Sequence, residues 1–196
     1  AQQEWGEPPM VELLCADGRT FERWEDGQLV QYDRVLVDAP CTHDGSLKHV
    51  FKWADRGDLD HLRKYCFPED LTDITQLQLD LLCNGYRLLK PGGVLVYSTC
   101  SLTRAQNEEV VQRFLDSHPP GPHAPQLQAC VPHFLASGAL QRLRTLFPPA
   151  SDVAAAAHTI VPCVEGTVPG TVRFEPHQVA CGGLFVCRIR KGPGGE

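Results

Sequence analysis

The sequence predicts an α/β fold in which strands and helices alternate around one sheet. Three short runs rich in Val and Leu, bounded by polar residues or by Gly and Pro, indicate buried strands over residues 10–17, 34–40 and 93–100. Such nearly continuous apolar runs favour a parallel sheet that is covered on both faces. The alternation with helical patterns favours a doubly wound sheet, in which ligands bind outside the carboxyl ends of the strands.

A helix is predicted between the second and third strands, with Pro91–Gly93 as its stop signal. Its apolar residues recur at helical spacing: Leu71, Ile74, Leu77, Leu81 and Leu88. A second helix is predicted after the third strand, with Thr103 as N-cap and Gln106 at the capping-box position. Its apolar stripe consists of Val110, Val111, Phe114 and Leu115.

The last third of the chain gives weaker signals. Four prolines between His118 and Pro125 predict a surface connection, because proline lacks the amide donor that helices and central strands need. Residues 135–147 indicate a short helical or variable segment. Residues 158–164 and 182–191 predict two closing strands that pair antiparallel, and the glycines that follow predict a flexible tail over 192–196.

Composition favours one globular domain without a strong charge bias. The chain has 196 residues, of which 42% are hydrophobic and 21% charged. With 18 Lys and Arg against 24 Asp and Glu, the net charge of -6 lacks the basic excess of an autonomous nucleic-acid binder. No apolar run approaches the about 20 residues that cross a bilayer, so no membrane partner is expected.

Nine cysteines, an odd number, without a visible secretory signal favour reduced thiols in an intracellular compartment, which the sequence does not specify further. No C-x-x-C pair is present, so we expect no metal site. The nearest approach to metal-ligand spacing is Cys181 with Cys187 near His177, and buried strand cysteines are the favoured interpretation there.

Polar residues follow each predicted strand at its carboxyl end: Asp17, then Asp38, Pro40 and Cys41, then Thr99 and Cys100. If the second and third strands are neighbours, Cys41 and Cys100 converge on one pocket. A thiolate is a strong nucleophile and also leaves readily, which suits a transient covalent adduct. Methylation at C5 of a pyrimidine is such a reaction: thiolate addition at C6 activates C5, a carboxyl group at N3 assists, and a second thiol can assist release.

The motifs YDRVLVDAPC, LKPGGVLVYSTCSLT, QNEEVV and GGLFVCRIRK, in this order, resemble the NSUN (Nop/Sun, RsmB-like) RNA cytosine-5 methyltransferases from about Val11 onward. The resemblance implies a Rossmann-like fold that uses S-adenosylmethionine. It also implies that Cys100, and not Cys41, is the nucleophile. The residue pattern alone does not decide between the two cysteines. DNA cytosine-5 methyltransferases share Pro-Cys but follow it with Glu-Asn-Val, which is absent here, so RNA is the expected substrate.

The resemblance also implies the roles of the other rim residues. Cys41 would assist product release, and Asp38 would contact the cytosine around N3 and lie near the donor together with Pro40. Asp17 would contact the adenosine part of S-adenosylmethionine. Two simpler interpretations stay open. Asp38, two residues before Pro40, could instead cap the following loop, and Asp17 before Gly18 is a common turn pair.

The chain departs from the family in one region. The glycine-rich donor loop and the first two strands of the family fold have no counterpart, so we expect residues 1–191 to be the C-terminal part of a catalytic domain. In the family's strand order those two strands lie between the runs at 10–17 and 34–40. We therefore expect weakened donor binding by this chain.

The segment after Cys41 permits more than one interpretation. Positive side chains there could contact phosphates, but interspersed aspartates make a mixed solvated face equally reasonable: Lys48, Lys52, Arg56, Arg63 and Lys64. His43, His49 and His61 match no ligand spacing, and we expect surface roles for them. Asn107 and Glu108 could order the loop around Cys100 or simply begin a helix.

Together these patterns predict an RNA cytosine-5 methyltransferase that acts on rRNA or tRNA. The alternative is a truncated, non-catalytic module that binds RNA or protein. Donor binding distinguishes the two, because only the enzyme requires S-adenosylmethionine.

Overall fold

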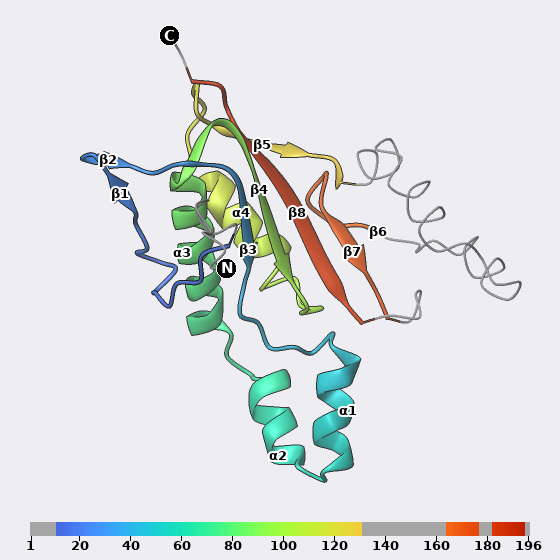
Figure 1. Cartoon of the computed structure of the whole chain (residues 1–196). Coiled ribbons are helices and arrows are strands. Elements are labelled where there is room, and N and C mark those ends of the chain that lie inside the picture. Colours follow the sequence, from blue (N-terminus) through green and yellow to red (C-terminus); the bar gives the residue numbers. More distant parts are fainter. Residues whose placement is uncertain (1–10, 131–163, 177–181, 195–196) are drawn as a thin grey trace, which may run out of the picture.

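A computed structural model describes residues 11–130, 164–176 and 182–194 (Figure 1). Its elements, in chain order, are β1 (Trp24–Glu25), β2 (Gln28–Leu29), β3 (Tyr32–Asp38), α1 (Leu47–Asp55), α2 (Leu59–His61), the π-helical turn η1 (Leu62–Cys66), α3 (Thr72–Arg87), β4 (Leu89–Thr99), α4 (Glu108–Asp116), β5 (Pro125–Gln128), β6 (Val164–Glu165), β7 (Val172–Phe174) and β8 (Leu184–Lys191).

The main sheet has the strand order β3-β4-β8-β7-β6, and β5 also pairs with β8. Strands β3 and β4 are parallel and α3 connects them, which confirms the predicted strand, helix, strand unit. The predicted closing strand at 182–191 is β8, and it runs antiparallel to β4, β5 and β7. The fold is therefore α/β as predicted, with a mixed sheet.

Helices α3 and α4 pack side by side on one face of β3 and β4 (Figure 1). Gly85 allows the close approach of α3, because a Cβ atom there would lie 2.8 Å from Val37 and 3.1 Å from Leu95. The predicted stripe of α4 is confirmed, since Val110, Val111 and Phe114 are completely buried. Burial of this apolar surface is what holds the helices on the sheet.

The opposite face of β3 is not covered in the part of the chain that the structure describes. Leu36, whose side chain alternates with those of Val35 and Val37, is 68% exposed. The expectation of a sheet covered on both faces is thus wrong at β3. The pattern of continuous apolar residues was correct for a strand but did not specify what lies above each face.

The strand predicted at 10–17 is also wrong, since residues 11–17 form no strand and are exposed. Val11 is 70% exposed and Leu13 is 91% exposed. A strand needs a neighbour for its backbone hydrogen bonds, and among the described residues the family strands that would lie between this run and β3 have no counterpart. An apolar run without that neighbour does not become a strand.

Two predicted helix boundaries are corrected. Helix α3 ends at Arg87 and β4 begins at Leu89, so Pro91–Gly93 lies within the strand rather than stopping the helix. Helix α4 begins at Glu108 with Asn107 as N-cap, so Thr103 is not the cap. The reason is that the side chain of Gln106 is used elsewhere, as described below.

In the last third of the chain, β5 and β7 were not predicted. The expected helical segment at 135–147 and residues 158–163 of the other closing strand lie outside the described residues. The last residue of that strand, Val164, lies in β6, which pairs with β7, so the predicted direct pairing with β8 is wrong there. In the expected tail, the Gly192 and Gly194 amides donate to the carbonyls of Ala124 and Pro122.

Candidate functional site

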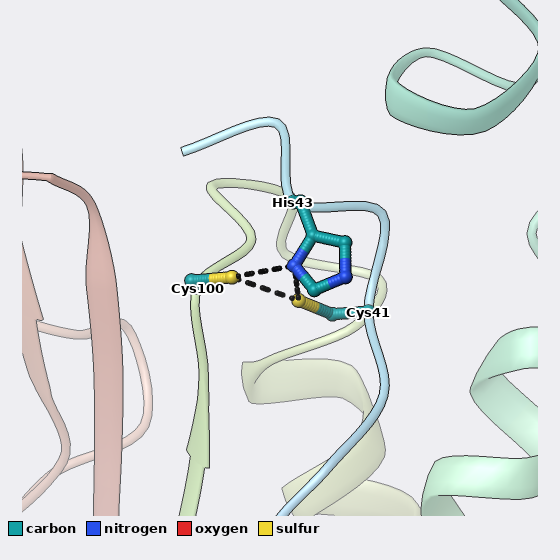
Figure 2. A group of neighbouring side chains, drawn as sticks. All are labelled: Cys41, His43 and Cys100. Atoms are coloured by element: carbon teal, nitrogen blue, oxygen red, sulfur yellow. Dashed lines mark hydrogen bonds between the residues drawn. The ribbon is translucent and has the colours of Figure 1, made fainter. Parts of the chain in front are cut away.

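The loops that follow β3 and β4 bring two thiols together. The strands are in register, with Asp38 opposite Ser98, and the Ala39 amide donates to the Ser98 carbonyl at 3.0 Å. The Sγ atoms of Cys41 and Cys100 are 3.3 Å apart (Figure 2). This confirms the prediction that the two cysteines converge, because parallel neighbouring strands end at the same edge of the sheet.

The backbone clamps the two loops to one another. The Gly45 amide donates to the Cys100 carbonyl at 3.0 Å, and the Gly183 amide donates to the Gly45 carbonyl at 2.6 Å. A Cβ atom at Gly45 would lie 2.6 Å from the Cys100 carbonyl oxygen, so only glycine permits this contact. Backbone hydrogen bonds among three segments, at Gly45, Cys100 and Gly183, therefore fix the positions of the loops that carry the two thiols.

Gln106 connects the residues that follow the two cysteines. Its completely buried side chain accepts from the Thr42 amide at 3.1 Å and donates to the Thr42 hydroxyl at 2.8 Å. It also donates to the hydroxyls of Ser101 and Thr103, at 3.0 and 2.9 Å. Gln106 is thus a bridge between the cysteine loops rather than a capping-box residue.

Asp44 and Asn107 hold the loop after Cys100. The Asp44 carboxylate accepts from the Thr42 hydroxyl and from the Leu102 amide at 2.9 Å. Asn107 donates to the Ser101 carbonyl at 2.9 Å and accepts from the Thr99 hydroxyl at 2.6 Å. Of the two roles considered for Asn107, the structure shows that it orders the loop.

Glu108 also holds the loop after Cys100, through an ion pair with Arg173. Its buried carboxylate receives two hydrogen bonds from the guanidinium of Arg173 on β7, and Arg173 also donates to the Leu102 carbonyl at 2.8 Å. Burial of the carboxyl opposes ionisation, but the bonds from Arg173 bring the pKa of Glu108 below its usual value. The charged pair anchors the loop after Cys100 to the sheet.

Asp38 and Pro40 lie at the rim as predicted. The Asp38 carboxylate is exposed and accepts from the Ser98 hydroxyl at 2.8 Å, which fixes its orientation at the end of β3. The ring of Pro40 is also exposed, and its carbonyl accepts from the Gln78 amide at 2.8 Å. Both residues are therefore available to a ligand beside Cys41.

Asp17 is not grouped with Asp38 or the thiols. Its carboxylate pairs with Arg19 at 2.6 Å, and this bonding lowers the pKa of Asp17 to about 2. The residue lines an open hollow of about 500 Å³ whose other walls include Asp80, Cys83 and Asn84 of α3. The expected convergence of Asp17 with the other strand ends fails because the strand before it does not form.

His43 is the site residue that sequence reasoning missed. Its Nδ1 atom lies 3.0 Å from the Cys100 Sγ and 3.8 Å from the Cys41 Sγ (Figure 2). The backbone has φ 57°, a left-handed conformation that histidine adopts more readily than most residues. The ring also stacks on His49 at 4.8 Å between centroids. The available signal was its position two residues after Cys41, whereas ligand spacing along the sequence was uninformative.

The two thiols differ in acidity because they share a hydrogen bond. Donation from Cys100 lowers the pKa of Cys41 to about 6, and the same contact, with burial, raises the pKa of Cys100. Strongly interacting groups titrate as a pair. The shared hydrogen bond therefore favours the negative charge of the pair on Cys41.

The helical segment 47–66 projects beyond the carboxyl end of β3 (Figure 1). Trp53 stacks on His61 at 3.6 Å, with Lys52 and Arg56 over the Trp53 ring. The five basic side chains considered above are all exposed on this segment or its connections. The surface combines aromatic rings and positive charge with the exposed carboxylates of Asp55, Asp58 and Asp60, so both interpretations of this segment stay open.

The zinc-like spacing in the sequence at Cys181 and Cys187 near His177 gains no support from the described residues. Cys187 is completely buried in β8, and burial raises the pKa of its thiol. Cys181 and His177 lie outside the described residues. Buried strand cysteine is the correct interpretation of Cys187.

An α/β sheet with paired thiols and an aspartate at one rim defines a class of proteins suited to covalent catalysis by cysteine. Within that class, residues 8–190 match the profile of a family described as 16S rRNA methyltransferase RsmB/F. The match covers most of the chain, so the protein belongs to the RsmB/F methyltransferase family, as its motifs suggested.

Curated relatives agree with this assignment. The chain is 39% identical over 111 residues to ribosomal RNA small subunit methyltransferase B of Vibrio vulnificus, covering 56% of this chain and 23% of that protein. It is 36% identical over 110 residues to the mitochondrial tRNA (cytosine(34)-C(5))-methyltransferase of Danio rerio, covering 56% and 27%. The chain thus spans about a quarter of the length of these relatives.

A solved structure supports the fold. The crystal structure of NSun6 from Pyrococcus horikoshii with SFG matches with a TM-score of 0.51 and 22% identity, covering 83% of this chain and 30% of that one. The likeness confirms the Rossmann-like methyltransferase architecture. Separately, within the described residues no helix has both the length and the apolar character to cross a membrane.

Proposed function

We propose that this chain is the C-terminal part, over residues 1–191, of the catalytic domain of an RNA (cytosine-5)-methyltransferase that uses S-adenosylmethionine. The single observation that carries the proposal is the 3.3 Å approach of Cys41 and Cys100 at the carboxyl ends of neighbouring parallel strands. Family membership supports it, and so does the name of the zebrafish relative, which specifies the cytosine C5 position.

The proposed chemistry begins with a proton transfer within the thiol pair. Cys41 carries the negative charge at rest, so it accepts the proton of Cys100 across 3.3 Å. The freed Cys100 thiolate then adds to C6 of the cytosine. His43 lies 3.0 Å from the same sulfur and can hydrogen-bond the thiolate as it forms. A nucleophile beside a base is the usual arrangement for covalent catalysis.

Addition of sulfur at C6 moves an electron pair to C5, which then bonds to the methyl group that S-adenosylmethionine supplies. Asp38, exposed and oriented by Ser98, is placed to hydrogen-bond around N3 of the base during the addition. Once Cys41 has given its proton to water, its thiolate can accept the C5 proton, which restores the double bond as the Cys100–C6 bond breaks and Cys100 leaves as a thiolate. Cys41, the thiol nearest Cys100, is the proposed group that assists this release.

The described residues fit the donor only in part. Asp38 and Pro40 are exposed beside the thiols, which suits a donor held at the strand ends. Asp17 is instead paired with Arg19 beside α3, so in this structure it does not extend that surface. We therefore assign Asp38 and Pro40, and not Asp17, to the donor side of the site, and we expect donor binding to be weak.

The proposed substrate is rRNA or tRNA. The aromatic and basic surface on residues 47–66 adjoins the cysteine loops in sequence and offers stacking and phosphate contacts. The target base must be unpaired or flipped to reach the two thiols. A reducing intracellular compartment suits the mechanism, because Cys41 and Cys100 must remain thiols.

The experiment that tests the function uses RNA containing 5-azacytidine, which traps the covalent adduct because the C5 proton is replaced by nitrogen. The protein is incubated with this RNA and S-adenosylmethionine and run on a denaturing gel. We expect a shifted band for the unmodified protein and for the control Cys83→Ala, and none for Cys100→Ala. For Cys41→Ala we expect the adduct to form slowly and persist. Binding of RNA without any adduct in every variant would instead support the non-catalytic binding module.

A further inference from the structure

Three soft or borderline metal ligands meet at the rim. The Sγ atoms of Cys41 and Cys100 and a ring nitrogen of His43 lie within 4.8 Å of one another (Figure 2). The pairwise separations are 3.3 Å between the sulfurs, and 3.0 and 3.8 Å from Nδ1 to Cys100 and Cys41. Figure 2 shows the imidazole nitrogen facing both sulfurs from the loop after β3.

These separations are close to those of a tetrahedral zinc site. With Zn–S bonds of about 2.3 Å and a Zn–N bond of about 2.0 Å, tetrahedral angles place two sulfurs about 3.8 Å apart and sulfur and nitrogen about 3.5 Å apart. Each separation in the structure differs from the ideal value by about 0.5 Å or less, so small side-chain rotations are sufficient. The three ligands form one triangular face of the tetrahedron.

The surrounding structure holds this face in place. The left-handed backbone of His43 directs its ring at the sulfurs, and the contact between Gly45 and the Cys100 carbonyl keeps the two loops together. His43 is exposed, so the fourth position opens to solvent. Three protein ligands with an open fourth position are a known arrangement for zinc.

We propose that Cys41, His43 and Cys100 bind a single Zn²⁺ ion, and that bound zinc reversibly blocks the thiol pair. Binding forms two Zn–S bonds and one Zn–N bond and releases the one proton that the thiol pair holds, without any change of oxidation state. The binding claim depends only on the geometry. The inhibitory claim rests on the proposed function: zinc withdraws electron density from the Cys100 sulfur and holds it at the metal, which makes it a weaker nucleophile toward C6.

The test uses Co²⁺ as a spectroscopic substitute for zinc in the reduced, metal-free chain. We expect one equivalent of Co²⁺ to give the visible bands of a tetrahedral site and a thiolate-to-metal charge-transfer band, and Zn²⁺ to remove both. Cys41→Ser or Cys100→Ser should halve the charge-transfer intensity, and the double variant should abolish it. His43→Asn, which tolerates the left-handed backbone, should weaken binding by at least about tenfold.

Cys66→Ser and Cys83→Ser serve as controls, because these thiols lie outside the cluster. They should leave the spectrum unchanged, and circular dichroism should verify that each variant is folded. A spectrum that persists in the double cysteine variant, or one insensitive to His43→Asn, would overturn the site. Absence of tetrahedral cobalt binding would overturn it as well.

Inhibition is measured separately with the 5-azacytidine adduct. Zinc at one equivalent should suppress the adduct, and a chelator should restore it. An adduct undiminished at full zinc occupancy overturns the inhibitory claim. If cobalt binds as described but the metal-free protein forms no adduct, the proposed function has failed while the metal site stands.

Discussion

At the scale of single residues, the site depends on an unequal pair of thiols. Cys41 lies in the loop after β3 and is buried, whereas Cys100 is half-buried at the end of β4. Their shared hydrogen bond favours charge on Cys41 at rest, although Cys100 is the proposed nucleophile. In the proposed mechanism, the nucleophile therefore becomes reactive when its proton moves to Cys41.

This difference predicts the pH dependence of thiol modification. Because the pKa of Cys41 is lowered to about 6, its thiolate is present above that pH and lost as the pH falls through it. Alkylation of Cys41 by iodoacetamide, followed by peptide mass spectrometry, should rise through about pH 6. In Cys100→Ala the donor is lost, and the midpoint should move upward toward the ordinary cysteine value. An unchanged midpoint in this variant would show that Cys100 is not the cause.

Gln106 provides the second prediction. Replacement by alanine leaves the Thr42 amide and neighbouring hydroxyls without their buried partner, which should cost about 1–3 kcal/mol in the free energy of unfolding. Urea denaturation measures this loss. The matched control is Gln112→Ala on the exposed side of α4, which should change stability by no more than about 0.5 kcal/mol. Equal losses in the two variants would contradict the bridging role.

The sequence identified Cys41, Cys100 and Asp38 because strand ends are readable from apolar runs followed by polar residues. It did not identify the roles of His43 and Gln106. The position of the His43 ring depends on a left-handed backbone in a loop, and that conformation has no periodic signal. The hydrogen bonds between Gln106 and Thr42 join residues 64 positions apart, which local patterns cannot show.

At the scale of elements, α4 and β7 are joined by a buried ion pair that supports the loop after Cys100. Glu108→Gln leaves Arg173 without its charged partner and should destabilise the fold by about 3–5 kcal/mol. The pKa of Glu108 is lowered in the fold, so its contribution is complete above the unfolded value of about 4.3 and is lost as the pH falls through the folded pKa. Denaturation of wild type and variant should therefore converge in acid.

Glu109→Gln is the control for this prediction, because Glu109 is the exposed neighbour at the start of the same helix. Its stability should stay near that of the wild type at neutral pH. If both variants lose the same free energy, the buried pair has no special role in holding the loop.

Most of the longer elements were predictable from their patterns, but α1, which has nine residues, was not predicted. Strands β3, β4 and β8 and helices α3 and α4 all contain seven residues or more, and each was predicted. Strands β5 and β7 have four and three residues, too few for periodicity. Residues 10–17 have the apolar pattern of a strand but lack a neighbouring strand among the described residues. Local sequence does not show whether such a neighbour is present.

At the scale of the whole molecule, the sheet is packed on one side at β3. Leu95 in β4 is completely buried against the helices, whereas Leu36 in β3 is 68% exposed on the other face. Leu95→Ala should cost about 2–5 kcal/mol in the free energy of unfolding. Leu36→Ala should cost no more than about 0.5 kcal/mol, since it removes little buried area. A large loss for Leu36→Ala would show that another part of the protein covers this face.

The most direct test of the central claim is to locate the covalent bond to RNA. The adduct trapped with 5-azacytidine is digested with protease and nuclease, and the modified peptide is sequenced by mass spectrometry. We expect the nucleotide on Cys100, whose proton has passed to Cys41. A nucleotide bound to Cys41 would contradict the account, because it would make the resting thiolate the nucleophile and reverse the roles of the two cysteines.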